Sequence, residues 1–391
     1  MKFGRRNTIF LGLATAVLLT ASGCSGGLLS GSGSDSGDTA TGPIKVGMVI
    51  PTSGSSAPTG VYMQNGAQMA IDEINKAGGV LDGQKLELLV EDGACDAQQA
   101  VASANKLVSN GVTISVGGYC SGATLPTLSI FQKASVPMII PAANSQDLVN
   151  QGLENVFLIN GTGLQQSSAA LEFMKKKGYV TAALVDDNTS YSKDITTETQ
   201  KQIEKDGAVK VLLNTSVTAG ESDYSSVVRD IRNANPEIVY WTGYYQEGGL
   251  IINQLKKQGY TGAVMVADGS VDPSLAQIAG AGSEGTFATM TQTPDTLEGA
   301  EDWIANYKKE FNAEPGPYST QSYDAVRLAA QAIEDAGNTK GDDMIAALEA
   351  IDGFKMFSGP LKFTPEHTLS SGGFVILVIK DGSFALEDAL S

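Results

Sequence analysis

The sequence has little of what metal and nucleic-acid chemistry requires. Its 391 residues include one histidine, two tryptophans and three cysteines, and its 26 basic residues are outnumbered by 43 acidic ones. A single histidine and so few thiols leave no imidazole or thiolate cluster that would hold zinc. The formal net charge of −17 argues against nucleic acid or an anionic lipid surface as a partner. We therefore expect no metal site and no nucleic-acid partner.

The loops that bind nucleotide cofactors are missing as well. No glycine-rich phosphate loop with its lysine is present, and the glycines at Gly117-Gly118 lack the third glycine of a dinucleotide fingerprint. We therefore expect no cofactor.

Long apolar runs are absent except near the start of the chain. Three basic residues are followed there by an apolar run of about eleven residues, Ile9–Leu19, and then by small residues. This run is too short for a membrane-spanning helix. Residues 1–23 therefore have the pattern of a secretory signal peptide.

The next residues resemble a bacterial lipobox, in which the cysteine is lipidated and becomes the first residue of the mature chain. The segment is LTASGC, ending at Cys24. Residues 24–42 are mostly Gly, Ser, Thr, Asp and Ala, a composition that forms a flexible tether. We expect an extracytoplasmic protein, lipid-anchored to the outer face of the bacterial cell membrane.

The two remaining cysteines are Cys95 and Cys120. An even pair in an exported chain predicts a disulfide. Such a bond would fix the loop that contains Cys120.

Strands and helices alternate along the rest of the chain, which predicts α/β architecture with parallel, doubly wound sheets. Helical stretches separate the predicted strands, which fall at residues 45–50, 85–90, 112–116 and 137–140 in the first half, and at 180–185, 209–214, 237–241, 263–267 and 374–379 further on.

One stretch, residues 112–123, has the pattern of a binding site. A β-branched strand ends in Gly117-Gly118, and a helix is expected to begin near Gly122. Glycines let a small molecule approach the backbone, and a helix N-terminus offers free N–H groups. We expect an anionic group to bind there.

Four segments resemble the leucine/isoleucine/valine-binding protein family, the extracytoplasmic receptors of branched-chain amino acid ABC transporters. They are residues 45–75, 91–96 (EDGACD), 118–121 (GYCS) and 140–143 (IPAA). The resemblance runs from about Ile44 to Asp381. The paired cysteines match the family's disulfide.

The resemblance implies the type I periplasmic-binding fold, two doubly wound parallel-sheet lobes joined by a three-strand hinge. It implies a first lobe of residues 43–162 and 292–369 and a second lobe of residues 163–291 and 370–391. The implied partners are an amino acid, most readily Leu, Ile or Val, and ABC permease subunits. We expect a monomer.

The resemblance also implies the contacts that a bound amino acid makes. The turn Tyr119-Cys120-Ser121 and the neighbouring Ala142 and Asn144 would receive the carboxylate, with Ser121 giving its hydroxyl and N–H. Asp268 matches the acidic position that pairs with the ammonium. The family commonly has glutamate at that position and threonine at the position of Asn144.

Aromatic and side-chain contacts complete the implied site. Tyr191 and Tyr244 match tyrosines of the second lobe that close onto the ligand. Thr59, Tyr119 and Tyr318 fall where the family contacts the ligand side chain. Because Thr59 stands where an aromatic residue often sits, other amino acids, amides or urea are alternative ligands.

Two alternatives come from other classes of protein. Residues 118–122 (GYCSG) have the form of a nucleophile elbow, and His367 follows later, as in a hydrolase with Cys120 as nucleophile. A disulfide would exclude this activity, and we expect His367 to be an exposed loop residue. The fold also serves ligand-sensing receptors, but the predicted lipid anchor and the lack of a predicted spanning or signalling segment favour transport.

Overall fold

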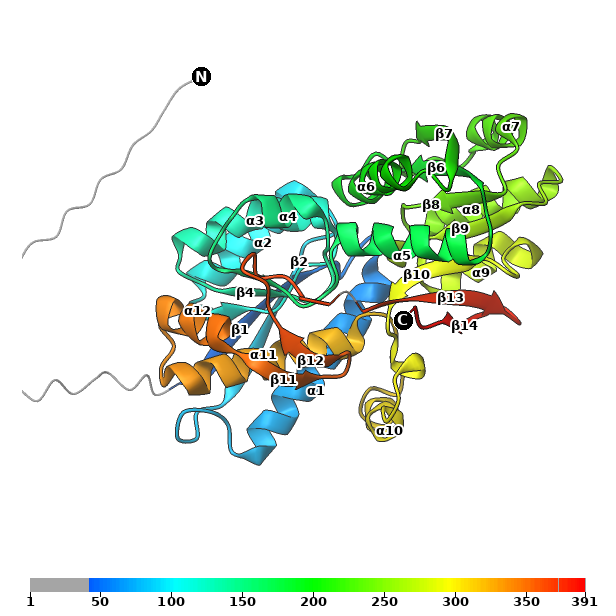
Figure 1. Cartoon of the computed structure of the whole chain (residues 1–391). Coiled ribbons are helices and arrows are strands. Elements are labelled where there is room, and N and C mark those ends of the chain that lie inside the picture. Colours follow the sequence, from blue (N-terminus) through cyan, green and yellow to red (C-terminus); the bar gives the residue numbers. More distant parts are fainter. Residues whose placement is uncertain (1–41, 372, 391) are drawn as a thin grey trace, which may run out of the picture. The chain divides into compact units, whose positions relative to one another are not determined.

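The computed structural model describes residues 42–371 and 373–390 of the chain. The signal peptide, Cys24 and nearly all of the tether lie outside the described residues, so the predictions for them stay predictions. The described chain forms two large sheets with helices on their faces and a small two-stranded sheet (Figure 1).

The first sheet has five strands in the order β2-β1-β3-β4-β5, and every pair in it is parallel. Its strands are β1 (Ile44–Ile50), β2 (Leu86–Asp92), β3 (Ile114–Ser115), β4 (Met138–Ile140) and β5 (Val156–Leu158). The predicted parallel sheet is confirmed, although β3 is shorter than the expected strand and β5 was not foreseen.

Helices cover both faces of this sheet. The helix α1 packs against α11, and α2 packs against α3. The two pairs lie on opposite sides of the strands (Figure 1). The helices of this part are α1 (Ala57–Ala77), α2 (Ala97–Ser109), α3 (Ser121–Lys133), α4 (Gln146–Asn150), α10 (Glu301–Phe311), α11 (Ser319–Ala336) and α12 (Gly341–Ala350).

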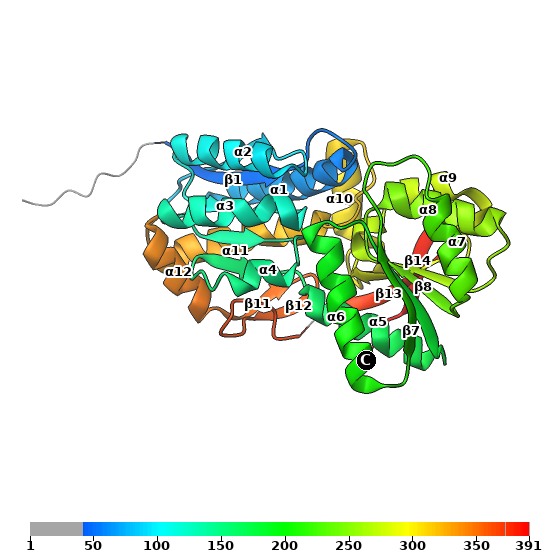
Figure 2. The ribbon, with the colours of Figure 1, turned by 90° about the horizontal axis from the view of Figure 1, so that it is seen from above.

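The second sheet has seven strands in the order β14-β13-β10-β9-β8-β6-β7. The strands are β6 (Thr181–Asp186), β7 (Lys210–Ser216), β8 (Ile238–Trp241), β9 (Ala263–Val266), β10 (Phe287–Thr291), β13 (Phe374–Lys380) and β14 (Ser383–Asp388). Helices again cover both faces (Figure 2), namely α5 (Gly163–Lys176), α6 (Ser190–Asp206), α7 (Ser225–Ala234), α8 (Tyr245–Lys257) and α9 (Pro273–Ala279). Short 3₁₀ turns are η1 (Asp268–Ser270), η2 (Gly280–Gly282) and η3 (Pro294–Thr296).

The second sheet is parallel from β7 to β10 and antiparallel at its other edge. The strand β13 pairs antiparallel with both β10 and β14. The hairpin β13–β14 turns through Asp381-Gly382, both with positive φ. The expected parallel sheet therefore needs a correction at this edge. The short turn makes β13 and β14 antiparallel, and β13 runs opposite to β10 after the long excursion of the chain through the first lobe.

The chain passes between the two sheets three times. It leaves the first sheet after β5 to enter α5, and leaves the second after β10 to form η3, α10 and α11. It returns after the small hairpin of β11 (Asp352–Met356) and β12 (Gly359–Lys362) to form β13. The exact residues at which the sequence analysis places the lobe boundaries remain predictions.

Burial explains why the strands have different sequence patterns. The central strand β8 is buried at every position, whereas the edge strand β7 alternates between exposed and half-buried residues. A central strand with helices on both faces has no solvent side, whereas an edge strand retains one.

Capping fixes two helix starts near the site. The carboxylate of Asp96 accepts the N–H of Gln99, as its position before α2 predicts. Thr162 and Gln165 form a reciprocal capping box at the start of α5. Both caps set the direction in which a helix leaves the neighbourhood of the site.

Within residues 42–371 and 373–390, no helix is long and apolar enough to span a membrane.

Candidate ligand-binding site

The start of α3 forms one side of the candidate site. Gly117 lies so close to β1 that an added Cβ would stand 2.5 Å from the backbone nitrogen of Val49, and Gly118 has φ +114°. Only glycine fits both positions. The strand therefore turns directly into α3, which begins at Ser121 with first-turn N–H groups that have no partner within the helix.

Ser121 is fully buried and ties α3 to the next turn of the same sheet. Its Oγ accepts the N–H of Asn144 at 3.3 Å and the N–H of Ser145 at 3.2 Å. The hydroxyl proton stays available for donation, because both of these bonds use oxygen lone pairs.

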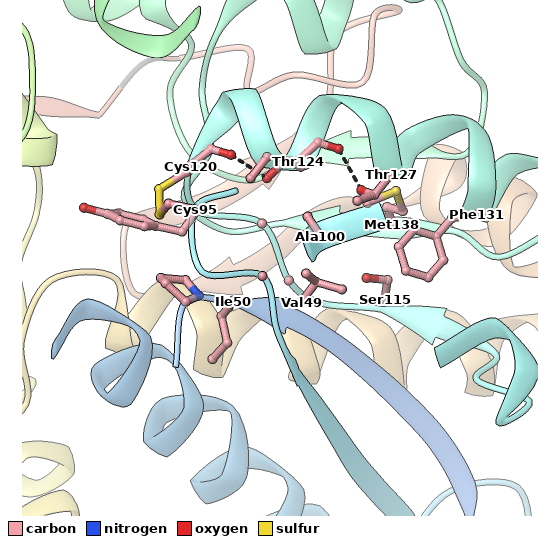
Figure 3. Close-up of a pocket in the computed structure, with 16 residues that line it drawn as sticks. Val49, Ile50, Cys95, Ala100, Ser115, Cys120, Thr124, Thr127, Phe131 and Met138 are labelled. Carbon is pink, nitrogen blue, oxygen red and sulfur yellow. Dashed lines mark hydrogen bonds between the residues drawn. A yellow bond between two sulfur atoms is a disulfide. The ribbon is translucent and has the colours of Figure 1, made fainter. Parts of the chain in front are cut away.

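The predicted disulfide between Cys95 and Cys120 is confirmed. It joins the loop after β2 to the residue that precedes α3 (Figure 3). Behind it lies a cavity of about 20 Å³, lined by Gly118, Phe131 and Met138 among others. Such a volume holds about one water molecule, so this cavity is too small for an amino acid.

Asp268 forms the other side of the site. It follows β9 in the turn η1 and is 3% exposed. Its Oδ1 accepts bonds from Tyr191 Oη at 2.5 Å and from Gln166 Nε2 at 2.8 Å. Its Oδ2 accepts bonds from Tyr318 Oη at 2.5 Å and from Asn144 Nδ2 at 3.5 Å. Burial raises the pKa of Asp268, and the bonds from Tyr191, Tyr318 and Gln166 oppose that rise.

Four tyrosine rings gather around this carboxylate. The ring centroids of Tyr119 and Tyr318 are 5.7 Å apart, those of Tyr119 and Tyr244 are 6.1 Å apart, and those of Tyr191 and Tyr244 are 5.2 Å apart. Burial, reinforced by the charge of Asp268, holds the pKa of Tyr191 and of Tyr318 well above 10. Both hydroxyls therefore stay protonated donors at neutral pH.

Thr59 and Ala142 take structural positions beside the site. Thr59 lies buried on α1, close to the side chain of Tyr119. The carbonyl of Ala142 accepts a bond from Asn160 Nδ2 at 2.6 Å. This bond fixes the backbone two residues before Asn144.

Asn144 connects the two sides. Its N–H bonds to Ser121, and its Nδ2 donates to Gln166 Oε1 at 2.9 Å and reaches Asp268. Its Oδ1 is buried and has no hydrogen-bond partner. A donor on a ligand would satisfy this oxygen, because buried polar groups are ordinarily hydrogen-bonded.

The ten residues predicted to touch a ligand thus come together around the junction of the two sheets. Direct contacts link Asp268 with Tyr191, Tyr318 and Asn144, and ring contacts add Tyr119 and Tyr244. Whether these residues touch a ligand stays a prediction.

Gln166 belongs to this network and was not foreseen. It lies in the first turn of α5, is fully buried, and bridges Asp268 to Thr289 Oγ1 through Nε2. The sequence has adjacent glutamines at 165 and 166. Gln165 caps the helix and Gln166 points into the site. The direction of the helix decides which of the two glutamines takes each role.

The disulfide removes the nucleophile of the hydrolase hypothesis. Cys120 has no thiol, because it is bonded to Cys95. His367 was expected to be exposed, but its side chain is only 13% exposed and stacks on Phe157, with ring centroids 4.2 Å apart. The loop that carries His367 packs on β5, where the N–H of Leu158 donates to the carbonyl of His367, and this contact explains the difference.

Known proteins resemble this chain along most of its length. The family model described as periplasmic binding protein matches residues 43–383. The chain is 30% identical to Leu/Ile/Val-binding protein homolog 1 of Brucella melitensis over 381 residues, 97% of each chain. It is 33% identical over 334 residues to the leucine-, isoleucine-, valine-, threonine-, and alanine-binding protein of Pseudomonas aeruginosa, covering 85% of this chain and 89% of that one.

Solved structures of two amino acid binding proteins are similar to this chain along most of its length. The leucine binding protein LivK of Thermotoga maritima superposes with a TM-score of 0.82 at 25% identity, over 88% of this chain and 97% of that one. The substrate binding protein LivJ of Streptococcus pneumoniae, in complex with isoleucine, gives a TM-score of 0.81 at 25% identity, over 89% of this chain and 99% of that one.

Two α/β sheets joined by three crossings, with a polar site at their junction, define a solute-binding protein of the type I periplasmic-binding fold. The chain belongs to the periplasmic binding protein family, and within it to the Leu/Ile/Val-binding proteins. This family consists of solute-binding proteins and not of enzymes.

Proposed function

We propose that this protein is the substrate-binding lipoprotein of an ABC importer and captures a free amino acid between its two lobes. The observation that carries the proposal is the hydrogen-bond path from Ser121 through Asn144 to Asp268. It places a hydroxyl and helix N–H groups at one end of a short path and a buried carboxylate at the other. An amino acid has the complementary pair of groups, a carboxylate and an ammonium.

The ligand's carboxylate would take the hydroxyl proton of Ser121 and the first N–H groups of α3. Its ammonium would replace one of the donors that now occupy Asp268, most simply Asn144, whose bond is the longest at 3.5 Å. The tyrosines would enclose the ligand. The names of the relatives describe proteins that bind leucine, isoleucine and valine. We therefore expect the ligand of this protein to have a branched apolar side chain.

Binding would close the lobes, because the ligand contacts both. Ser121 begins α3, which packs on the first sheet, whereas Asp268 in η1 and Tyr191 in α6 lie with the second sheet. A ligand that bridges two bodies binds the closed state better than the open one and shifts the population toward it. The crossings at residues 161–163 and 291–294 would act as the hinge, since periplasmic binding proteins in general close around their ligands by hinge motion.

The closed form would then deliver the amino acid to a membrane permease, with the protein held at the membrane by a lipid on Cys24. A Cys24→Ala variant tests the anchor. We expect it to be released from the cell surface into the medium or periplasm, and retention of the variant in the membrane fraction would contradict the anchor.

Calorimetry tests which amino acid the protein binds. The purified protein is unfolded and refolded to remove carried-over ligand and is then titrated with each of the twenty amino acids. Saturable binding of leucine, isoleucine or valine is the expected result. If the folded protein binds none of the twenty, the amino acid proposal is wrong, and amides, ureas and small carboxylates are the next ligands to titrate.

A further inference from the structure

A pair of hydrogen bonds joins the two lobes at a place outside the candidate site. The hydroxyl of Tyr245 donates to the backbone carbonyl of Ser55 at 2.6 Å, and Nε2 of Gln246 donates to the same carbonyl at 3.0 Å. Ser55 lies in the loop between β1 and α1 of the first sheet, whereas α8, which begins with Tyr245 and Gln246, follows β8 of the second sheet. None of these three residues is among the ten predicted to touch the amino acid.

The acceptor side of this contact is held by Asp92, at the end of β2. Its Oδ1 accepts the N–H of Thr52 at 2.9 Å and that of Ser53 at 3.3 Å, and its Oδ2 accepts the hydroxyl of Ser53 at 2.5 Å. Desolvation would raise the pKa of Asp92, but these hydrogen bonds outweigh it and lower the pKa, so the carboxylate is charged at neutral pH. Gly54 then turns the loop with φ +75°, a conformation that glycine adopts without strain. The first lobe by itself therefore supports the loop that presents the carbonyl of Ser55.

The donor side is held just as firmly by the second lobe. Tyr245 is 7% exposed and packs in the apolar core. Burial, reinforced by the charge of Asp272, raises the pKa of its hydroxyl, which therefore stays a proton donor at neutral pH. The preceding residue is Tyr244, whose carbonyl accepts the indole N–H of Trp241 at 3.0 Å. The start of α8 thus carries both a predicted ligand contact and the two bonds to the other lobe.

Opening of the lobes has to break these two bonds. The chain joins the lobes only at its three crossings, and neither the loop of residues 51–56 nor the start of α8 belongs to a crossing. A hydrogen bond is lost once donor and acceptor move apart by about 1 Å. The net contribution of two such bonds corresponds to roughly a tenfold change in an equilibrium or a rate.

We propose that the carbonyl of Ser55, together with Tyr245 and Gln246, forms a clasp that favours the closed arrangement of the lobes, with or without a ligand between them, and sets the rate at which a bound ligand leaves. The clasp acts through the lobes and does not touch the ligand, so Tyr245 and Gln246 are positioning residues. The part that concerns ligand release rests on the proposed function, whereas closure of the lobes can be measured without a ligand.

The release rate is the first test. Because the acceptor is a backbone carbonyl, the clasp variant changes the donors and combines Tyr245→Phe with Gln246→Ala. In stopped-flow mixing with the amino acid that binds best, we expect its dissociation rate to rise at least about fivefold. The association rate should stay within about twofold of the wild type, because the clasp is not formed in the open state that captures the ligand. An unchanged dissociation rate in the folded variant overturns the proposal.

A matched control variant loses the same two kinds of bond within one lobe. It combines Tyr260→Phe, whose hydroxyl donates to the carbonyl of Pro236 at 2.8 Å, with Gln202→Ala, whose Nε2 donates to the carbonyl of Leu164 at 3.0 Å. All four residues lie with the second sheet. We expect wild-type rates in this variant. Equal acceleration of release in the clasp and control variants would show that any lost bond loosens the protein, and it overturns the proposal.

The second test measures closure without a ligand. Spin labels are attached to cysteines introduced at exposed positions of α1 and α7, Lys76→Cys and Asp230→Cys, in a Cys24→Ala background. Pulsed electron paramagnetic resonance then gives the distances between the labels in refolded protein free of amino acid. We expect a population at short distance in the wild type and in the control variant, and a population at least about fivefold smaller in the clasp variant.

The two tests separate the clasp from the proposed function. If none of the twenty amino acids binds but the short-distance population falls in the clasp variant, the proposed function fails and the clasp stands. If an amino acid binds but the three proteins have the same distances without it, the proposed function stands and the clasp is overturned.

Discussion

Tyr318 donates a hydrogen bond of 2.5 Å to Asp268 across the junction of the two sheets. Tyr318 immediately precedes α11, which packs on α1 over the first sheet, and Asp268 follows β9 of the second sheet. One bond therefore links the two halves at the position where the ligand's ammonium is proposed to bind.

Removing the carboxylate should abolish most amino acid binding. In Asp268→Ala, we expect the affinity to fall by at least about 2 kcal/mol, because the ligand's ammonium would be buried without a partner. Calorimetry with the amino acid that binds best measures the change. Asp223→Ala, at an exposed surface position, is the control. Unchanged affinity in Asp268→Ala would move the ammonium site elsewhere.

Removing the hydroxyl of Tyr318 should lower the stability of the fold, because Asp268 loses a hydrogen bond. In Tyr318→Phe, we expect the free energy of unfolding to fall by about 1.5 kcal/mol, because a buried charged acceptor loses a donor. Denaturant titration measures it, and a double-mutant cycle with Asp268→Asn should give a coupling of about 1 kcal/mol.

Tyr323→Phe serves as the matched control for this change. It removes a hydroxyl that bonds to exposed Glu73, and we expect a loss below about 0.5 kcal/mol. Equal effects of the two tyrosine changes, with no coupling to Asp268, would mean that the Tyr318 bond contributes nothing specific.

The disulfide should contribute substantially to stability. Replacing Cys95 and Cys120 by serine opens a closed loop whose ends are 25 residues apart, and the loop-entropy relation gives a loss of roughly 3.5 kcal/mol. Thermal unfolding of the double variant and of the wild type measures it. A thiol assay on unfolded, unreduced wild type should find no thiol from Cys95 or Cys120, and a reactive Cys120 would reopen the hydrolase hypothesis.

Asp194 should make stability depend on pH. It accepts the N–H of Gln146 at 2.8 Å, and burial raises the pKa of its carboxyl to about 6. The unfolded chain titrates lower, near about 4. The folded state therefore holds this proton more tightly, so the contribution of Asp194 is fully present below about pH 4 and is lost as the pH rises to about 6.

Unfolding in denaturant at several pH values between about 4 and 7 measures this effect. Asp194→Asn should flatten the decline of the free energy of unfolding between about pH 4 and 6, whereas the same change at exposed Asp230 should leave it as in the wild type. Identical slopes for all three proteins would show that Asp194 does not titrate in this range.

Much of the candidate site could be located from the sequence because its parts are local. Gly117-Gly118 at the end of a strand, and Ser121 at the start of a helix, follow from the turn that glycine permits. Asp268 was located by its place after a buried strand together with the family resemblance. The sequence did not show that the side chain of Gln166 points into the site. That direction depends on where α5 begins and how it is oriented, which the capping box of Thr162 and Gln165 sets in the folded protein.

The sequence by itself determined the alternating α/β architecture, the pairing of Cys95 with Cys120 and the segments that approach the ligand, because hydrophobic periodicity, glycine and residue spacing act over short distances. Only the tertiary structure decided the antiparallel edge at β13, the stacking of His367 on Phe157 and the bonds that bring Tyr318, Gln166 and Asn144 to Asp268. These contacts join residues far apart in the chain, and the packing of two sheets through three crossings sets their distances.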